Sequence, residues 1–231
     1  MRLYDAIFIR RSVRKYTAEI SDEKREKLLN FIKNVTPLYD NIKYEIIPAN
    51  KGVNSKVKAP CYILYYSEKK KGYSVNAGFI MQQIDLFAQS IGLGSCWLGL
   101  SSADIKSEKG YKYVIMLAVG ETEKAYRTSA EDFNRKPLEE VGNLEDISLL
   151  SAVRLAPSAV NKQPWYYYQR ETGEIDIYLK RNMVYKALLK KFDGIDIGIS
   201  LCHFFIALSA QNKKFELIEP DNKSYLSLKT S

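Results

Sequence analysis

Residues 155–165 read Leu155-Ala156-Pro157-Ser158-Ala159-Val160-Asn161-Lys162-Gln163-Pro164-Trp165, and they separate a predicted helix from a predicted strand. Two prolines bracket a short polar loop, so a rigid backbone would hold Ser158, Asn161 and Gln163 with their hydrogen-bonding groups available to a ligand. The alternative is a helix-terminal turn in which Asn161 and Gln163 bond only to backbone. Taken alone, the segment does not choose between these interpretations.

Proline and asparagine also occur at matching positions earlier in the chain. Pro37, Asn41 and Gly78 each recur 120 residues later, at positions 157, 161 and 198. Duplicated halves are expected to align in this way, although proline and glycine recur at element boundaries in many α/β chains. The sequence therefore favours two diverged copies that pack as a pseudo-dimer within one globular unit, residues 1–231. We take 1–142 as the first repeat and 143–231 as the second, shorter one.

Hydrophobic periodicity supports this division, because an order of helix, proline stop, strands and long helix occurs twice. The predicted helices cover residues 3–10, 21–35 (with Ser21 as N-cap), 75–91, 145–155 and 195–210. The predicted strands cover residues 42–48, 60–66, 113–119, 165–169 and 175–179. The predicted fold class is α+β, with an antiparallel or mixed sheet in each half and the two long helices packed together in the core.

Composition excludes several classes of protein. The chain has 231 residues, 46% hydrophobic and 27% charged, with a net charge of +8; this excludes a disordered chain, and three cysteines are too few for a disulfide scaffold. Basic residues mostly alternate with acids, as in 21–27, so we expect a local anion site and no nucleic-acid partner. His203 is the only histidine and the cysteines have no CxxC spacing, which predicts no metal site and thiols in a reducing cytoplasm. No run of about 20 apolar residues predicts a membrane span.

Residues 10–14, Arg10-Arg11-Ser12-Val13-Arg14, form a candidate anion site. If the chain is extended here, Arg10, Ser12 and Arg14 point to one side and combine two guanidinium forks with a hydroxyl group. Such a set suits a phosphate. The alternative is a basic helix end that is stabilised by the helix dipole.

Residues 92–99, Gly92-Leu93-Gly94-Ser95-Cys96-Trp97-Leu98-Gly99, end the long helix predicted before them. Their glycines allow close approach of the backbone to a flat ligand. The segment follows a helix and not a strand, so it does not meet the context of a dinucleotide-binding fingerprint.

Together these three segments resemble the FMN-dependent nitroreductase family, which carries RRSxR near its N-terminus, PSxxNxQPW after a helix and GLGxCWxG after a long helix. One departure is the order, because the family normally has PSxxNxQPW before GLGxCWxG within one copy. Family members are typically homodimers with the flavin at the interface, where one subunit supplies the PSxxN loop and the other supplies the remaining segments. The resemblance thus implies a nitroreductase dimer fused into one chain, able to exist as a monomer and holding one FMN.

The resemblance also implies roles for individual residues. Arg10, Ser12 and Arg14 would bind the FMN phosphate with Arg11 nearby, since charge-assisted guanidinium forks suit a dianion. Arg135 lies in a basic segment like the one that ends a family subunit, and it is either a fourth phosphate ligand or a linker cation. The residues expected along the flavin ring and ribityl chain are Pro157, Ser158, Ala159 and Asn161. The backbone amides expected at the N5 edge of the flavin are those of Leu98 and Gly99.

The implied activity is the NADH- or NADPH-driven reduction of nitroaromatic, quinone or similar small acceptors by a ping-pong hydride mechanism. No catalytic side chain is expected, because the flavin performs the difficult step. His203 is expected to be a core or interface residue, and Trp97 and Trp165 are expected to pack. The alternative is a binding protein of the same fold that retains FMN without turnover.

Overall fold

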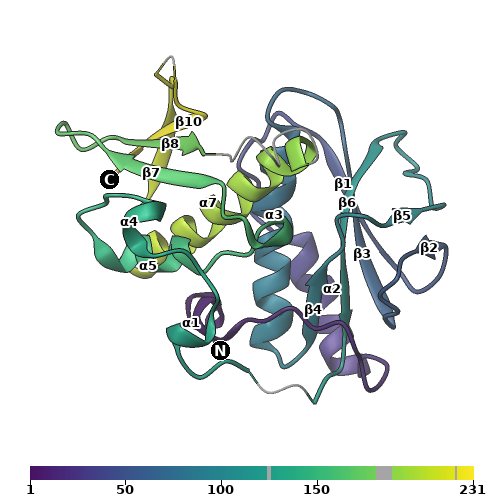
Figure 1. Ribbon diagram of the computed structural model, residues 1–231. Coiled ribbons are helices and arrows are strands. Elements are labelled where there is room, and N and C mark those ends of the chain that lie inside the picture. Colours follow the sequence, from purple (N-terminus) through teal and green to yellow (C-terminus); the bar gives the residue numbers. More distant parts are fainter. Residues whose placement is uncertain (124–125, 181–188, 222) are drawn as a thin grey trace.

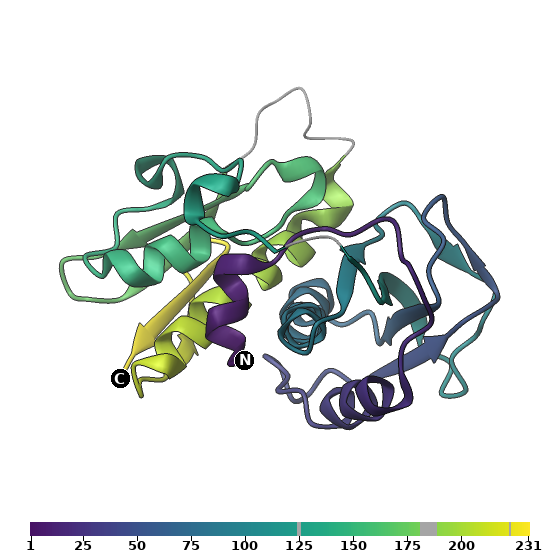
Figure 2. The same ribbon diagram turned by 90° about the horizontal axis from the view of Figure 1, so that it is seen from below.

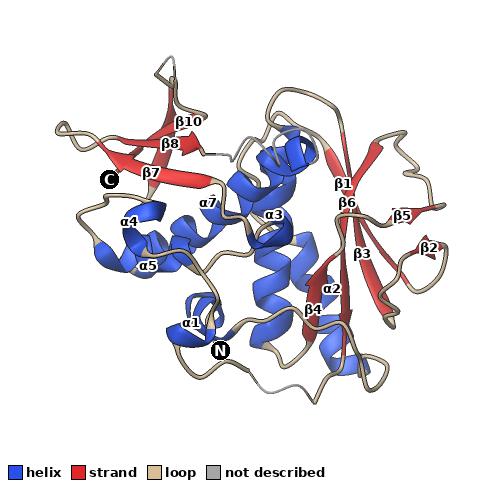
Figure 3. Ribbon diagram, viewed as in Figure 1, coloured by secondary structure: helices blue, strands red, loops and turns tan. Residues whose placement is uncertain are grey.

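The computed structural model describes residues 1–231 except 124–125, 181–188 and 222. Its helices are α1 (Leu3–Ile9), α2 (Asp22–Lys33), α3 (Tyr73–Ser90), α4 (Leu138–Val141), α5 (Ile147–Arg154), α7 (Asp193–Ala210) and the short 3₁₀ turns η1 (Ala130–Asp132), η2 (Ala159–Asn161) and η4 (Lys190–Phe192). Its strands are β1 (Tyr44–Ala49), β2 (Val53–Asn54), β3 (Cys61–Ser67), β4 (Gly94–Trp97), β5 (Ser102–Ala103), β6 (Lys112–Gly120), β7 (Trp165–Gln169), β8 (Ile175–Leu179), β9 (Phe215–Ile218) and β10 (Leu226–Thr230). Figure 3 shows the long helices α3 and α7 between two separate sheets.

The two main sheets have the same topology. One has the strand order β1-β3-β6-β4 and the other β7-β8-β10-β9, and every recorded pairing in them is antiparallel. In each sheet, therefore, the third and fourth main strands along the chain have exchanged places in space. The central strand β3 is buried along its whole length, as its β-branched and aromatic residues require. A small third sheet, β2–β5, lies beyond the first.

The long helices α3 and α7 pack against each other between the two sheets (Figure 1). Each has 18 residues. They meet through glycine: a Cβ on Gly78 would lie 2.1 Å from the carbonyl oxygen of Ile195, and one on Gly198 would lie 2.0 Å from that of Val75. Because Val75 and Ile195 are also 120 residues apart, the crossing makes the same contact twice, once in each direction.

The first turn of each long helix also fixes a loop. Asn76 Oδ1 accepts a hydrogen bond from the Tyr39 amide at 3.1 Å, and Asp196 Oδ1 accepts one from the Ala159 amide at 2.9 Å. Asn76 and Asp196 are 120 residues apart, as are Tyr39 and Ala159. The loop after α5 is therefore positioned by the same kind of bond as the loop after α2.

The N-terminal segment connects the two halves. Helix α1 packs against both α3 and α7, and the chain then crosses over to the first sheet (Figure 2). There Ser12 forms a parallel bridge with Ser95, and the Val13 amide donates to the Ser95 carbonyl at 2.8 Å. Residues 10–14 thus leave the helix and extend along the outer edge of β4, which agrees with the extended interpretation of this segment.

Most predicted elements are confirmed, including the packing of the two long helices and the bounds of β7 and β8. Among the strands of the two main sheets, the prediction missed β4, β9 and β10. β4 begins at a glycine within a segment that looked like a helix stop, and β9 and β10 are short and interrupted by charged residues. The stretch Lys190–Ala210 is long and apolar enough to cross a membrane, but 83% of its apolar window is buried, as in the core helix of a soluble protein.

We expect Gly78→Ala and Gly198→Ala each to lower the free energy of unfolding by at least about 2 kcal/mol, since the new methyl group would overlap a backbone carbonyl. At a helix position with open space around it, glycine to alanine raises the free energy of unfolding by roughly 1 kcal/mol. The sign of the change therefore shows whether the two glycines are needed for the helix contact. Urea unfolding measures both variants. Ser209→Ala, at an exposed position on α7, is the control and should unfold like the parent chain.

Candidate functional site

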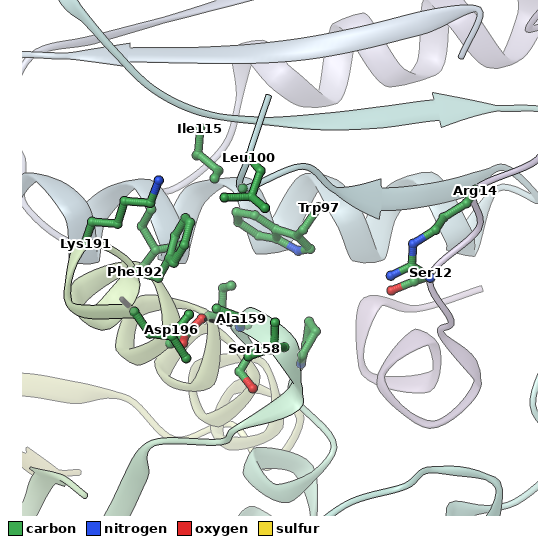
Figure 4. A pocket seen from close by; sticks show the side chains of 16 residues that line it. Ser12, Arg14, Trp97, Leu100, Ile115, Ser158, Ala159, Lys191, Phe192 and Asp196 are labelled. Carbon is green, nitrogen blue, oxygen red and sulfur yellow. Dashed lines mark hydrogen bonds between the residues drawn. The ribbon is translucent and has the colours of Figure 1, made fainter. Parts of the chain in front are cut away.

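A cavity of about 520 Å³ lies between residues of the two halves. Figure 4 shows Trp97 and Leu100 on one side of it and Ser158 and Ala159 on the other. Ser12 and Arg14 lie at one end, and Lys191 and Phe192 at the other (Figure 4). The lining residues are Ser12, Arg14, Trp97, Gly99, Leu100, Ile115, Pro157, Ser158, Ala159, Val160, Leu189, Lys191, Phe192, Ile195, Asp196 and Ile199. Six of the predicted site residues therefore meet here: Ser12, Arg14, Gly99, Pro157, Ser158 and Ala159.

The loop 158–163 has a strained backbone. Val160, Asn161 and Gln163 all have positive φ values, of 45°, 58° and 46°, which is costly for residues other than glycine and most of all for a β-branched valine. Hydrogen bonds hold this conformation, because Ser158 Oγ accepts from the Gln163 amide at 2.8 Å and Asp196 holds the Ala159 amide. The Ser158 hydroxyl keeps its own proton for donation and lines the cavity.

The side-chain amides of Asn161 and Gln163 bind residues 134–136 and not the cavity. Arg135 Nη1 donates to Asn161 Oδ1 at 2.7 Å, and the Lys136 amide donates to Gln163 Oε1 at 3.0 Å. Asn161, expected along a bound flavin, does not line the cavity. Its contact instead joins the loop to Arg135, which was predicted to be either a phosphate ligand or a linker cation.

Arg10 and Arg135 form the centre of a cationic cluster. Arg10 is only 1% exposed, and its Nε donates to Asp85 Oδ2 at 2.9 Å. Arg127 lies beside it and donates to the Arg10 carbonyl. Burial, followed by the charges of Arg10 and Arg127, lowers the pKa of Arg135 to about 9. Cations that lower one another's pKa are stabilised when an anion binds between them.

Two nitrogen atoms of this cluster are buried without a hydrogen-bond partner: Arg10 Nη2 and Arg135 Nε. Buried polar groups are normally satisfied, because an unpaired one costs about 1–3 kcal/mol or more when charged. Both atoms are donors only, so their missing partner must be an acceptor. Arg10 itself does not line the 520 Å³ cavity; Ser12 and Arg14, next along the chain, do.

The two amides of the glycine-rich segment that were expected to face a ligand, those of Leu98 and Gly99, differ in the structure. The Leu98 amide, expected to face a ligand, donates instead to the Met116 carbonyl at 3.0 Å, because the pairing of β4 with β6 continues to this point. This part of the prediction is wrong. The Gly99 amide has no recorded acceptor within the described residues, and a Cβ at Gly99 would lie 2.9 Å from the Phe192 ring.

Trp97 lines the cavity, although the sequence suggested only a packing role. Its indole N–H donates to Gln82 Oε1 at 3.1 Å, which fixes the orientation of the Gln82 amide. Gln82 Nε2 then donates both to Asp85 Oδ2 and to His203 Nε2, each at 3.1 Å. His203 is therefore neutral, with its proton on Nδ1 and donated to the Ala152 carbonyl at 2.9 Å. Burial lowers the His203 pKa to about 3, and the expected core placement of this residue is confirmed.

Comparison with known proteins shows the family of this chain. The family model described as "Putative TM nitroreductase" matches residues 2–208. The chain belongs to this nitroreductase family. A structure from Thermotoga maritima, described as that of a putative nitroreductase, has 21% identity and a TM-score of 0.69, over 99% of this chain and 93% of its own. The predicted nitroreductase-like α+β fold is confirmed.

Two further structures come from Clostridium difficile. A nitroreductase family protein of strain 630 has 19% identity and a TM-score of 0.50, over 62% of this chain and 96% of its own. A protein of strain R20291, named as an FMN-dependent nitroreductase, has 21% identity and a TM-score of 0.43, over 59% of this chain and 95% of its own. A search of the curated proteins found no match.

Sequence reasoning missed two buried acids of this nitroreductase-family chain, Asp85 and Asp196. Asp85 is the only charged residue of α3, Asp196 is one of two in α7, and each is less than 4% exposed. A carboxylate on a buried helix face requires a partner, which was the available signal. Lys191 and Phe192 also line the cavity, and no comparable signal in the sequence pointed to them.

We expect Asp85→Asn to lower the free energy of unfolding by about 3–5 kcal/mol, because it leaves the buried Arg10 guanidinium without a counter-ion. Asp85 also accepts from Ser95 Oγ at 2.6 Å, so the edge of β4 should loosen as well. Asp5→Asn is the matched control, since Asp5 pairs with the exposed Arg2. Urea unfolding should show no measurable change for the control; equal losses would contradict a special role of the buried pair.

A second prediction concerns pH. Because the folded pKa of His203 is about 3 and the unfolded value is about 6.5, only the unfolded chain takes up this proton between those values. The contribution of His203 to the free energy of unfolding is fully present above pH 6.5. It falls as the pH drops, with a slope approaching 1.4 kcal/mol per pH unit. Urea unfolding at pH 7, 6 and 5 should show a smaller slope for His203→Gln. Parallel curves for the two chains would contradict a neutral buried histidine.

Proposed function

We propose that this protein is an FMN-dependent oxidoreductase of nitroreductase type, which uses NADH or NADPH to reduce nitroaromatic, quinone or similar small acceptors. The observation that carries the proposal is the pair of buried guanidinium donors without acceptors, Arg10 Nη2 and Arg135 Nε. Arg10 lies in the segment that continues to Ser12 at the apolar cavity, and Arg135 binds the loop that contributes Ser158 to it. An anion joined to an aromatic body matches both parts at once.

The residues present fit the phosphate of FMN. A phosphate carries close to two negative charges near neutral pH and offers several acceptor oxygens. Guanidinium groups pair with such an anion in bidentate geometry, and the Ser12 hydroxyl and Arg14 lie at the same end of the cavity (Figure 4). Binding would satisfy the two orphan donors and would offset the burial and the neighbouring positive charges that lower the Arg135 pKa.

The rest of the cavity would hold the ring system. When bound, FMN would supply the hydride-transfer chemistry, and the protein would supply position and electrostatics. Trp97 and Ile115 form apolar walls that exclude water, and the Asp196 contact keeps Ala159 against the opposite side. The free Gly99 amide would donate to negative charge that develops at the ring edge.

We further propose that the chain is two diverged repeats, residues 1–142 and 143–231, arranged as an intrachain pseudo-dimer with one FMN. The shared strand order and the reciprocal glycine contacts support this, because a two-fold interface makes each contact in both directions. The alignment with the strain 630 protein covers 96% of that chain but only 62% of this one, so this chain is longer than a single copy of that protein. The cavity draws on both repeats, so neither would bind FMN alone.

Anaerobic visible spectroscopy tests this function. We expect the purified protein to be yellow, or to take up one FMN per chain, and to bleach with NADH or NADPH and recover its colour when p-benzoquinone is added. Arg135→Gln should weaken FMN binding about 10- to 100-fold, the value of one charge-assisted hydrogen bond. Arg2→Gln is the matched control, because Arg2 pairs only with the exposed Asp5.

The possible outcomes separate the hypotheses. FMN that binds but is reduced by neither nicotinamide would favour the flavin-retaining protein over the enzyme. A chain that takes up no FMN would contradict both. Two equal FMN sites would leave the activity possible and overturn the single-site pseudo-dimer.

A further inference from the structure

A second cavity, of about 700 Å³, lies where the loop after α2 meets α3, α7 and β9. Its lining residues are Thr36, Pro37, Leu38, Phe79, Phe205, Ser209, Asn212, Lys213, Lys214, Phe215, Glu216 and Leu217. None of them lines the first cavity. The proposed flavin site therefore does not account for this space.

The two cavities occupy corresponding places in the chain. Four lining residues of the second are each displaced by 120 positions from lining residues of the first: Pro37 from Pro157, Leu38 from Ser158, Phe79 from Ile199 and Leu217 from Trp97. The halves also exchange roles. The first cavity takes its loop from the second half and its strand from the first, whereas the second cavity does the reverse. Such an exchange is what two-fold related sites require.

The chemistry of the second cavity is nevertheless different. Leu38 stands at the position of Ser158, and no arginine lines the cavity. Nothing here resembles the guanidinium cluster, so a phosphate ester such as FMN has no built site. In the first half the strand edge of β4 is covered by residues 12 and 13; no described segment pairs with the corresponding edge of β9.

The walls of the second cavity favour an aromatic ring. Phe79, Phe205 and Phe215 contact one another in series, with ring centroids 5.3 Å and 6.3 Å apart. Leu38 and Leu217 add aliphatic surface. Aromatic rings gain from tilted and edge-to-face contacts with such a series, beyond the area that they bury.

The charges of this cavity favour an acid. Lys213 and Lys214 are exposed in the turn before β9, and neither forms an ion pair among the described residues. Glu216 is the one acidic lining residue, and it stands opposite Lys229 in the register of β9 and β10. A positive surplus therefore remains beside the aromatic wall.

We propose that this second cavity binds a small aromatic carboxylate, with its ring among the three phenylalanines and its acid group at Lys213 and Lys214. The proposal stands on the lining of this cavity and holds whether or not the first cavity binds FMN. The two cavities are then former equivalents that have diverged in ligand class, one toward a phosphate ester and the other toward a phosphate-free acid.

Calorimetric titration with naphthalene-2-carboxylate tests the proposal, performed on the full chain with and without saturating FMN. With saturating FMN in the first cavity we expect one site per chain, and the affinity of that site should be the same without FMN. Leu217→Glu, which puts a carboxylate into the cavity, should weaken binding at least about tenfold through like-charge repulsion. The double variant Lys213→Gln/Lys214→Gln should weaken it several-fold, while Lys109→Gln, at an exposed lysine elsewhere, should leave it unchanged.

An uncharged probe of the same shape, 2-naphthalenemethanol, separates the two contributions. It should bind the lysine double variant as well as it binds the parent chain. Absence of naphthalene-2-carboxylate binding, its complete displacement by FMN, or equal affinity in Leu217→Glu and the parent in the presence of FMN would each overturn the proposal. If Leu217→Glu does not fold, the lysine double variant decides alone, and unchanged carboxylate affinity in it overturns the proposal.

Discussion

The contact of α3 with α7 through Gly78 and Gly198 is the constraint on which the rest of the structure depends. With no side chain at either glycine, each helix backbone rests against the carbonyls of the other. This close approach fixes how near the two sheets can come, since each sheet is built on one of these helices. Only at this separation does the loop at Pro157–Ala159 come opposite Trp97 and Gly99 and form a cavity.

One buried carboxylate organises much of the polar interior. A carboxylate on α3, Asp85, receives hydrogen bonds from Arg10, Ser95 and Gln82. Gln82 passes the network on to Trp97 and His203. The same buried group therefore orients a cation of the proposed phosphate site and a wall of the cavity, while Arg10 Nη2 is left without a partner. A network satisfied everywhere except at one donor is pre-organised for an acceptor.

The sequence was informative where structure is local. Helical periodicity located α3 and α7, and paired prolines located the loop at 157–164, because these signals need no distant partner. The 120-residue offset found Gly78 and Gly198 before their contact was known. The offset could not show that the Leu98 amide donates to the Met116 carbonyl or that Asn161 accepts from Arg135. Nor could it show that Trp97 lines the cavity. Each of those outcomes is decided by residues far away in the chain.

The position of α1 has a consequence for how the protein is made. This helix comprises the residues Leu3–Ile9, yet one of its packing partners is α7, close to the other end of the chain. During synthesis α1 leaves the ribosome well before α7, so it has to wait for this distant partner. The native site thus closes only after α7 is available, and this long-range step makes folding slower than the helical content alone would suggest.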